Sequence, residues 1–222
     1  MKAVAIVSGG MDSVTALHHI NPSFSDVIVL SFNYGQRHLR ELEAARYNAI
    51  RLGREHHVID LPIADLLPGS ALTDPANVPM PHGHYAEETM RQTVVPGRNA
   101  MMLSIAWGVA AAHGCDVVVA AVHAGDHFIY PDCRPEFVRA LEDALRLGTI
   151  GHGGDKLSFF MPFQFFNKAD ILRIGHAIGV DYAHTWTCYE GGDLACGRCG
   201  ACRERLEAFD RHGKRDPLRY AP

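Results

Sequence analysis

The sequence has no hydrophobic run long enough to cross a membrane and no excess of positive charge. Its longest apolar stretch, residues 101–122, is interrupted by His113 and Asp116 and falls short of the roughly 18 uninterrupted residues of a membrane helix. Lysine and arginine total 21 against 25 aspartates and glutamates, so the net charge of −4 provides no basic field for a phosphate backbone. We expect neither a membrane protein nor a stable nucleic-acid binder.

The sequence also lacks a recognisable export signal. Its apolar run at residues 1–7 is shorter than the hydrophobic region of a signal peptide and is followed by Gly9, Gly10 and Asp12. We therefore expect a cytoplasmic protein. Six cysteines in a reducing compartment are more typical of metal binding or catalysis than of disulfide bonds.

Two glycine motifs that bind nucleotides in many α/β proteins, G-x-x-x-x-G-K-[ST] and G-x-G-x-x-G, are absent. The composition itself is ordinary: the 222 residues are 47% hydrophobic and 21% charged, which is typical of a globular chain and excludes disordered and collagen-like structure. No internal repeat or low-complexity tract occurs.

Hydrophobic periodicity predicts alternating strands and helices. Residues 2–7 and 27–32 are β-branched apolar runs without polar alternation, as expected of parallel strands buried on both faces. Residues 12–20 and 39–52 have the spacing of helices, and residues 57–61 follow as a third strand. The first third of the chain therefore predicts a βαβαβ unit.

A proline-rich stretch divides this unit from a second regular region. Six prolines between residues 62 and 96 predict a long loop. After it, residues 99–113, 135–147 and 167–178 are predicted helices, and residues 116–122 a strand. Right-handed crossovers then give an α/β fold with an open, parallel, doubly wound sheet, whose ligand lies beyond the carboxyl ends of the strands.

The segment Ser8-Gly9-Gly10-Met11-Asp12-Ser13 lies where the first strand ends and a helix begins. Free backbone N–H groups and the helix dipole favour an anion there, and glycine lets the backbone approach it. The hydroxyls of Ser8 and Ser13 can add donors. The alternative is a simple turn in which Asp12 and Ser13 only cap the helix.

Four cysteines near the C-terminus have the spacing of metal ligands. Cys188, Cys196, Cys199 and Cys202 form a C-x7-C-x2-C-x2-C pattern among glycines, which matches a closed, structural four-thiolate zinc site. An iron–sulfur cluster is the rival, although the fourth cysteine of the ferredoxin-type run is missing. We expect one structural zinc ion that fixes the terminal segment.

The other two cysteines have different expected roles. Cys115 opens an apolar strand and is interpreted as a small buried hydrophobic residue. Cys133 lies at the predicted ligand edge of the sheet, so either a reactive thiol or a turn residue is possible there.

The S-G-G-x-D-S segment directly after an N-terminal strand resembles the loop of the ATP pyrophosphatase superfamily, also called PP-loop or adenine nucleotide alpha hydrolase-like proteins. The resemblance implies that ATP is cleaved between its α and β phosphates, with Mg²⁺ and the loop residues Val7 to Ser13 holding pyrophosphate. The bound nucleotide would be ATP, and the expected chemistry is AMP-forming activation of an acceptor. The contributing positions are Val7, Ser8, Gly9, Gly10, Met11, Asp12 and Ser13.

Further motifs narrow the resemblance and run in order along nearly the whole chain. Together they are similar to the 7-cyano-7-deazaguanine synthase family of queuosine biosynthesis. The segments are SGGMDS at 8–13, YGQRH at 34–38, VPGRN at 95–99, YPDCRPEF at 130–137, NKADI at 167–171 and TCY with the cysteines at 187–202.

This family resemblance implies that 7-carboxy-7-deazaguanine and ammonia are converted into 7-cyano-7-deazaguanine with two ATP, through adenylate and amide intermediates. Members bind zinc through four such cysteines and are commonly homodimers. We expect a PP-loop α/β domain at residues 1–183 and a zinc-binding segment packed on it at residues 184–222.

Motif position also selects candidate site residues. Ser8, Asp12, Ser13, Arg98 and Lys168 are expected to be catalytic, because fixed cations stabilise the transferred phosphate and an anionic substrate. Substrate contacts are expected from Tyr34, Arg37, Asp132 and Arg134. The arginines could instead form surface ion pairs, Asp132 could cap the helix at 135, and Tyr34 could simply pack.

Two small differences from the family pattern bear on the product. Ala121 and Ile129 stand where glycines are often found, and added side chains there could shift substrate preference or stop the reaction at the amide. The alternatives to the main interpretation are therefore an enzyme that stops at 7-amido-7-deazaguanine, a relative that adenylates another acceptor, and a zinc-stabilised nucleotide-binding module without turnover.

Overall fold

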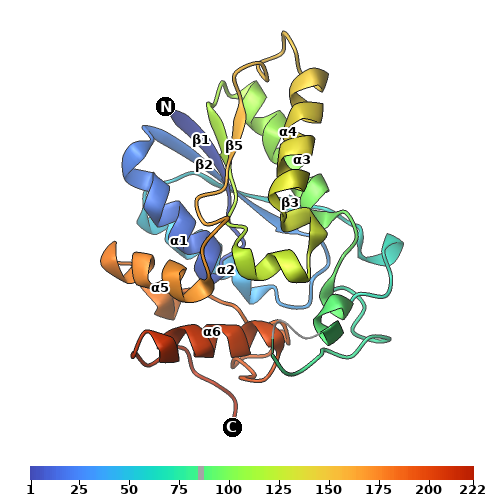
Figure 1. Cartoon of the computed structure of the whole chain (residues 1–222), viewed down its shortest axis with the longest axis vertical. Coiled ribbons are helices and arrows are strands. Elements are labelled where there is room, and N and C mark those ends of the chain that lie inside the picture. The colour runs from blue at the N-terminus through green and yellow to red at the C-terminus, as the bar shows by residue number, and fades with distance from the viewer. Residues whose placement is uncertain (85–87) are drawn as a thin grey trace.

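A single parallel sheet of five strands organises the chain. The computed structural model describes residues 1–84 and 88–222 (Figure 1). The strands lie in the order β3-β2-β1-β4-β5, and all four neighbouring pairs are parallel. The strands are β1 (Lys2–Ile6), β2 (Asp26–Asn33), β3 (His56–Asp60), β4 (Val117–Val119) and β5 (Ser158–Phe160). The predicted parallel α/β sheet is confirmed.

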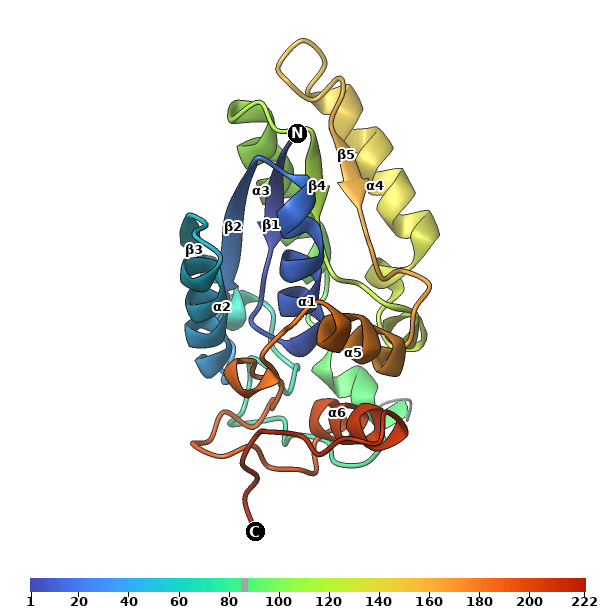
Figure 2. The same cartoon turned by 90° about the vertical axis from the view of Figure 1, so that its left-hand side faces the viewer.

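Helices cover both faces of this sheet, as expected for a doubly wound fold. Alternate residues of β1 point to opposite faces: Ala3 and Ala5 pack with one set of helices, whereas Val4 packs with the other. The first set is α1 (Met11–Ile20), α2 (Arg40–Arg51) and α5 (Lys168–Ala177), and the second is α3 (Arg98–Ala112) and α4 (Pro135–Gly148) (Figure 2).

The long excursion between β3 and α3 contains no strand among its described residues. It contributes two short 3₁₀ helices, at Ala64–Leu66 and Glu88–Thr93. Its residue His82 forms an isolated antiparallel bridge with Cys199, so the excursion lies against the C-terminal segment. The interpretation of residues 62–96 as a loop is confirmed.

Two elements and one boundary differ from the sequence prediction. The predicted strand at 116–122 pairs only over Val117–Val119, because the chain leaves the sheet toward its ligand edge after Val119. Strand β5 was not predicted, and neither was α6 (Gly200–Arg211), which begins within the cysteine cluster. Helix α6 lies beyond the carboxyl end of the sheet, next to α5 (Figures 1 and 2).

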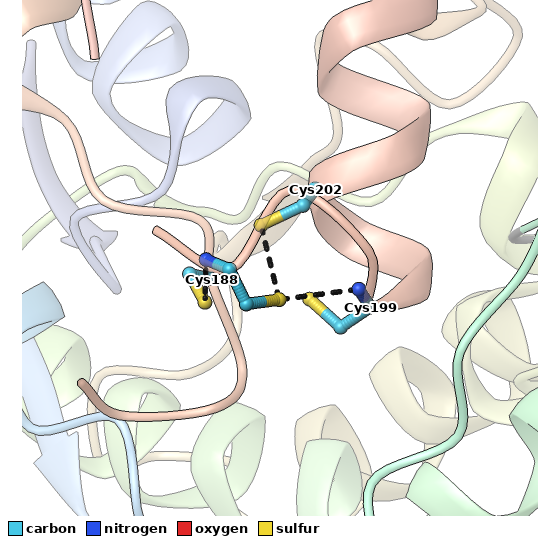
Figure 3. Close-up of side chains that lie close together, drawn as sticks. Cys188, Cys199 and Cys202 are labelled. Carbon is cyan, nitrogen blue, oxygen red and sulfur yellow. Dashed lines mark hydrogen bonds between the residues drawn. The ribbon is translucent and has the colours of Figure 1, made fainter. Parts of the chain in front are cut away.

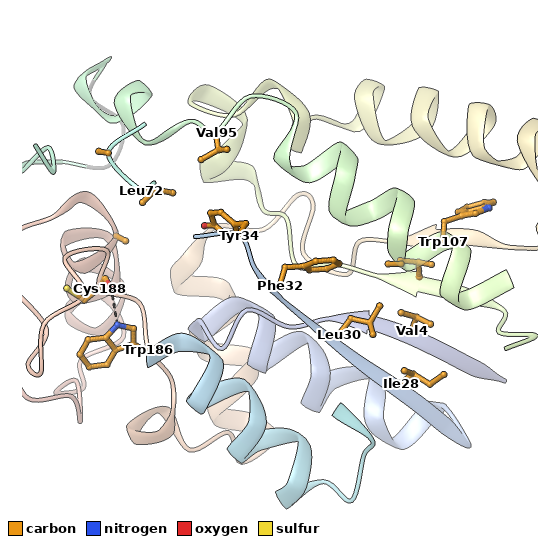
Figure 4. Packing of buried hydrophobic residues seen from close by; sticks show 14 of the residues in the cluster. Val4, Ile28, Leu30, Phe32, Tyr34, Leu72, Val95, Trp107, Trp186 and Cys188 are labelled. Carbon is orange, nitrogen blue, oxygen red and sulfur yellow. Dashed lines mark hydrogen bonds between the residues drawn. The ribbon is translucent and has the colours of Figure 1, made fainter. Parts of the chain in front are cut away.

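The hydrophobic core extends without a break from the sheet into the C-terminal segment. Val4, Ile28 and Trp107 belong to the same buried cluster as Cys188 and Cys202. Trp107 and Cys188 lie at opposite ends of this cluster (Figure 4). Burial of each large apolar side chain contributes about 1.5–3 kcal/mol, so the core holds the terminal segment against the ends of the strands.

Candidate active site

The loop between β1 and α1 turns sharply because of one glycine. Gly9 has φ +99°, and a Cβ atom there would lie 1.9 Å from the Glu41 carbonyl oxygen. Only glycine fits this position. The Gly9 N–H donates to the Ser13 hydroxyl at 3.2 Å, and the Gly10 N–H donates to the Ser8 hydroxyl at 3.2 Å. The two hydroxyl oxygens lie 3.1 Å apart, so the predicted serines converge.

The start of α1 is open toward a cavity of about 230 Å³. Its N-cap residue, Gly10, supplies no side-chain hydrogen bond to the first turn. The free N–H groups of that turn and the helix dipole therefore favour a bound anion. Of the loop residues, Gly9 alone does not line the cavity, and the residues that do are Val7, Ser8, Gly10, Met11, Asp12 and Ser13.

A charged cluster lies beside the loop and is centred on Lys168. The Lys168 ammonium is 2.6 Å from Glu204 Oε2 and 3.2 Å from Asp12 Oδ2, and its side chain is only 8% exposed. Burial alone would lower the pKa of Lys168, but Asp12 and Glu204 more than offset it and the pKa is raised. Lys168 therefore remains a fixed cation near the loop.

The His123 ring lies between the carboxylates of Asp12 and Asp126 in the same cluster. Its Nε2 atom lies 3.6 Å from Oδ2 of Asp12 and 3.6 Å from Oδ2 of Asp126. Its Nδ1 atom accepts a hydrogen bond from the Gly125 N–H at 3.1 Å, which places the proton of the neutral ring on Nε2. The imidazole thus separates two acidic side chains that would otherwise repel each other.

One oxygen of Asp12 is buried and has no hydrogen-bond partner among the described residues. Burial of an unpartnered carboxylate oxygen is costly, on the order of 1–3 kcal/mol, unless a ligand completes it. Asp12, Asp126 and Glu204 are oxygen donors of the type that Mg²⁺ prefers. The donor set at the loop therefore fits a divalent cation.

Arg98 occupies a different part of the same cavity. Its guanidinium lies over the rings of Tyr34 and Tyr130, 5.4 and 5.9 Å from their centroids, and donates to the Tyr34 hydroxyl at 3.1 Å. Burial raises the pKa of Tyr34 to about 12, so its phenol stays protonated. Within the part of the chain that the structure describes, no carboxylate pairs with Arg98.

Three other predicted substrate contacts do not line the cavity. Arg37 forms an ion pair with Glu190 at 3.3 Å. The Arg134 Nε–H donates to the His127 carbonyl oxygen at 2.9 Å. Asp132 has a buried oxygen without a hydrogen-bond partner in residues 1–84 and 88–222. By contrast, the structure brings Tyr34, Arg98 and Lys168 together with the loop.

Cys133 lines the cavity but is poorly suited to nucleophilic attack. Its sulfur accepts a hydrogen bond from the Asn99 side-chain amide at 3.2 Å. Burial raises the pKa of the Cys133 thiol well above its usual range, which keeps it protonated. Cys115 is 8% exposed, as expected of a small buried hydrophobic residue.

The four C-terminal cysteines form one cluster, with their sulfur atoms all within 4.8 Å of one another. The Cys199 backbone N–H donates to the Cys196 sulfur at 3.2 Å, and the Cys196 N–H donates to the Cys188 sulfur at 3.3 Å (Figure 3). The Arg198 N–H also donates to the Cys196 sulfur, at 3.4 Å. Such bonds stabilise thiolates. The donor set fits a tetrahedral metal site, so the predicted metal-binding group is confirmed.

Several residues that line the cavity or contact its charged cluster could not be identified from the motifs. His123 and Asp126 follow β4 at the carboxyl edge of the sheet, so a polar residue after a predicted strand could have identified them. Glu204 could not be found in this way, because it comes from α6 and reaches Lys168 only through tertiary packing. Trp186 and Thr187 reach the cavity from the segment that precedes the cysteines.

Comparisons with known proteins agree with this arrangement. The family model described as "Queuosine biosynthesis protein QueC" matches residues 2–213. A 7-cyano-7-deazaguanine synthase from Ruegeria sp. is 52% identical over 222 residues, which cover 100% of this chain and 94% of the relative. Another, from Pseudoalteromonas atlantica, is 49% identical over 220 residues and 99% and 98% of the two chains.

Among solved structures, NMN synthetase from Francisella tularensis has a similar fold. Its TM-score is 0.51 at 13% sequence identity, over 96% of this chain and 77% of that one. This likeness shows the α/β fold alone. None of the described helices is both long and apolar enough to span a membrane.

Proposed function

The chain belongs to the queuosine biosynthesis protein QueC family, and from this membership we propose that it is an ATP-dependent, AMP-forming nitrile synthase. It converts 7-carboxy-7-deazaguanine and ammonia into 7-cyano-7-deazaguanine and releases AMP and pyrophosphate. The observation that carries the proposal is the uncapped start of α1, whose first-turn N–H groups face the cavity that Lys168 and Arg98 also line.

The first half-reaction makes a carboxylate reactive. One carboxylate oxygen attacks the α phosphorus of ATP, the bond to the β phosphate breaks, and an acyl adenylate and pyrophosphate result. Ammonia then attacks the carbonyl carbon, and AMP leaves with the original carboxylate oxygen. The first-turn N–H groups of α1 and the Lys168 ammonium stabilise the negative charge that develops on the departing pyrophosphate.

The second half-reaction repeats this chemistry on the amide. The amide oxygen attacks the α phosphorus of a second ATP, pyrophosphate leaves, and the nitrogen loses a proton. Expulsion of AMP with the remaining oxygen then forms the C≡N bond and releases the second nitrogen-bound proton. Because the same bond of ATP breaks in both steps, one loop serves both.

Arg98 is suited to hold the anionic acceptor. Its guanidinium is fixed by two tyrosine rings and has no carboxylate partner among the described side chains. Tyr34 lines the same cavity, where its aromatic ring would contact the deazaguanine ring of the acceptor. Arg37 precedes the cavity residue His38 in the sequence, and Asp132 and Arg134 flank the cavity residue Cys133. These three residues therefore stay candidates for acceptor contacts.

Metal ions complete the proposal. Mg²⁺ would be held by Asp12 with Asp126 or Glu204, and when bound it neutralises the charge of the phosphate oxygens. The four cysteines would hold one Zn²⁺ as a closed structural site; a brown preparation with visible absorbance would indicate an iron–sulfur cluster instead.

Two statements about organisation belong to the same proposal. Residues 184–222 form a metal-binding segment packed on the α/β domain of residues 1–183, which the continuous core supports. The enzyme acts in the cytoplasm as a homodimer on small-molecule substrates, without a stable nucleic-acid partner, in line with its acidic net charge of −4.

The route of oxygen tests this proposal. With both carboxylate oxygens of the acceptor labelled with ¹⁸O, the enzyme should form two AMP molecules per nitrile, each with one ¹⁸O in its phosphate. Mass spectrometry of the quenched reaction reads this directly. Unlabelled AMP, or release of ADP and phosphate, would refute the proposal, and accumulation of labelled amide would identify an enzyme that stops halfway.

A further inference from the structure

A buried arginine behind the active site uses its entire hydrogen-bonding capacity. Arg205 of α6 is 0% exposed. Its Nε–H and one Nη2–H donate to the two oxygens of Asp216, at 2.7 and 2.9 Å. The other Nη2–H donates to the Tyr182 carbonyl oxygen at 2.9 Å. These three bonds join α6 to the C-terminal tail and to residues 182–187.

Two further donors bind hydroxyls in that same segment. The Arg205 Nη1 group donates to Thr185 Oγ1 at 2.7 Å and to Thr187 Oγ1 at 3.1 Å. All five N–H groups of the guanidinium are thus used, which fixes its orientation. Three of the five hold residues 182–187, so this arginine defines where the segment runs.

Residues 182–187 in turn contact the nucleotide loop. The Trp186 backbone N–H donates to the Gly9 carbonyl oxygen at 2.9 Å. The Tyr182 hydroxyl lies 2.8 Å from the hydroxyl of Thr15 on α1. Thr187 and Trp186 line the cavity, whereas Arg205 and Thr185 do not.

The hydrogen bond from Trp186 to the Gly9 carbonyl oxygen fixes the orientation of the Gly9–Gly10 peptide. In a trans peptide the carbonyl and the following N–H point in opposite directions. With the Gly9 carbonyl held by Trp186, the Gly10 N–H is directed toward the Ser8 hydroxyl. Rotation of that peptide would turn a carbonyl oxygen toward an anion, and glycine on both sides makes such rotation inexpensive.

We propose that Arg205 is a positioning residue for the nucleotide loop. Through Thr185 and Thr187 it holds Trp186 in place, and Trp186 locks the Gly9–Gly10 peptide in the orientation that binds pyrophosphate. The C-terminal segment therefore preorganises the loop as well as stabilising the fold. This inference rests on the proposed function of the loop.

The test is calorimetric titration of the metal-loaded protein with Mg²⁺ and inorganic pyrophosphate. Thr185→Val removes one acceptor of Arg205 at nearly constant shape and should weaken pyrophosphate binding about tenfold, whereas Thr185→Ser keeps the hydroxyl and should restore it. Arg205→Lys loses the forked geometry and should weaken binding further. In turnover assays, Thr185→Val should raise KM for ATP and leave KM for ammonium unchanged.

A distant destabilising variant separates positioning from general stability. Trp107→Phe removes a partly buried hydrogen bond to Thr149, at the end of the core far from Cys188. It should lower the melting temperature and leave pyrophosphate affinity at the wild-type value. Equal affinity of Thr185→Val and Thr185→Ser would overturn the inference. Failure of the wild-type protein itself to bind pyrophosphate would instead overturn the proposed function.

Discussion

Asp12 joins the loop to the charged cluster. One of its oxygens contacts Lys168 and the other is buried without a partner in the described structure. Under the proposed function, the interactions of Asp12 are completed only when phosphate and metal bind, so we expect this carboxylate to contribute little to stability and much to binding.

Asp12→Ala should reduce AMP formation by at least about 100-fold while the melting temperature stays near that of the wild type. The loss follows from removal of the proposed Mg²⁺ ligand and of a counter-charge of Lys168. Quenched-flow measurement of AMP and a thermal melt check the two parts. Asp143→Asn, on the exposed face of α4, is the matched control and should retain full activity. Unchanged turnover in Asp12→Ala would remove this carboxylate from the site.

Cys133 gives a second prediction at this scale. Because burial raises the pKa of its thiol, it should resist iodoacetamide at pH 8. Cys133→Ser should keep activity within about tenfold of the wild type, since the serine hydroxyl can still accept from Asn99. A thioester trapped by acid quench, detected as a mass increase on the peptide that contains Cys133, would contradict this expectation.

Among the elements, the tail after α6 depends most on one ion pair. Burial alone would raise the pKa of Asp216, but the bonds and charge of Arg205 more than offset it and the pKa is lowered. The Tyr220 hydroxyl donates to the same carboxylate at 2.5 Å. Since the folded pKa lies below the unfolded value of about 3.9, the stability from this pair is complete above that value and is lost as the pH falls through the folded pKa.

Asp216→Asn should therefore lower the free energy of unfolding by about 3–5 kcal/mol at pH 7, because it leaves a buried guanidinium without its counter-charge. The difference from the wild type should shrink as the pH falls below the unfolded value of about 3.9 and through the lower folded pKa, where the wild-type carboxyl also becomes protonated. Urea unfolding at pH 7 and at an acidic pH in this range measures the difference. A difference that is the same at both values would show that the charge of Asp216 is not involved.

Most helices and strands could be predicted from the sequence, including α4 and α5 in the second half of the chain, but β5 and α6 could not. Helices α1 and α2 were placed within one residue or so because their apolar faces repeat with helical spacing. Strand β5 has only three residues, of which Phe160 is partly exposed, so its pattern is too short to recognise. Helix α6 buries Arg205 where an apolar residue is expected, which hides its inner face.

Some residues of the candidate site could likewise be predicted from the sequence, and others could not. Ser8, Asp12, Ser13, Tyr34, Arg98 and Lys168 were identified from motifs and line one cavity. Glu204 was out of reach because its role exists only after α6 packs against α5. Residues that act through long-range packing leave no local signal in the sequence.

At the scale of the whole molecule, the cysteine cluster and the active site share elements. Helix α6 carries Cys202, Glu204 and Arg205, and the segment before it carries Trp186 and Cys188. The Trp186 indole N–H donates to the Cys188 carbonyl oxygen at 3.0 Å. Loss of metal from the cysteine cluster should therefore alter the conformation of the loop at residues 8–13.

Chelation of the metal, or Cys199→Ser, should release the metal from each chain, lower the melting temperature and weaken pyrophosphate binding together. Elemental analysis, thermal melting and calorimetry follow the three effects. Cys115→Ser, at a cysteine outside the cluster, is the control and should keep its metal. Loss of metal with unchanged pyrophosphate affinity would show that the two sites are independent.

The central claim is that residues 8–13 hold the two outer phosphates of ATP. A crystal structure with Mg²⁺ and the uncleavable analogue α,β-methylene-ATP tests it most directly. We predict the β and γ phosphates within hydrogen-bond distance of the loop N–H groups, and the α phosphate facing the acceptor side of the cavity near Arg98. A triphosphate bound elsewhere, or with its γ phosphate facing the acceptor, would contradict the account.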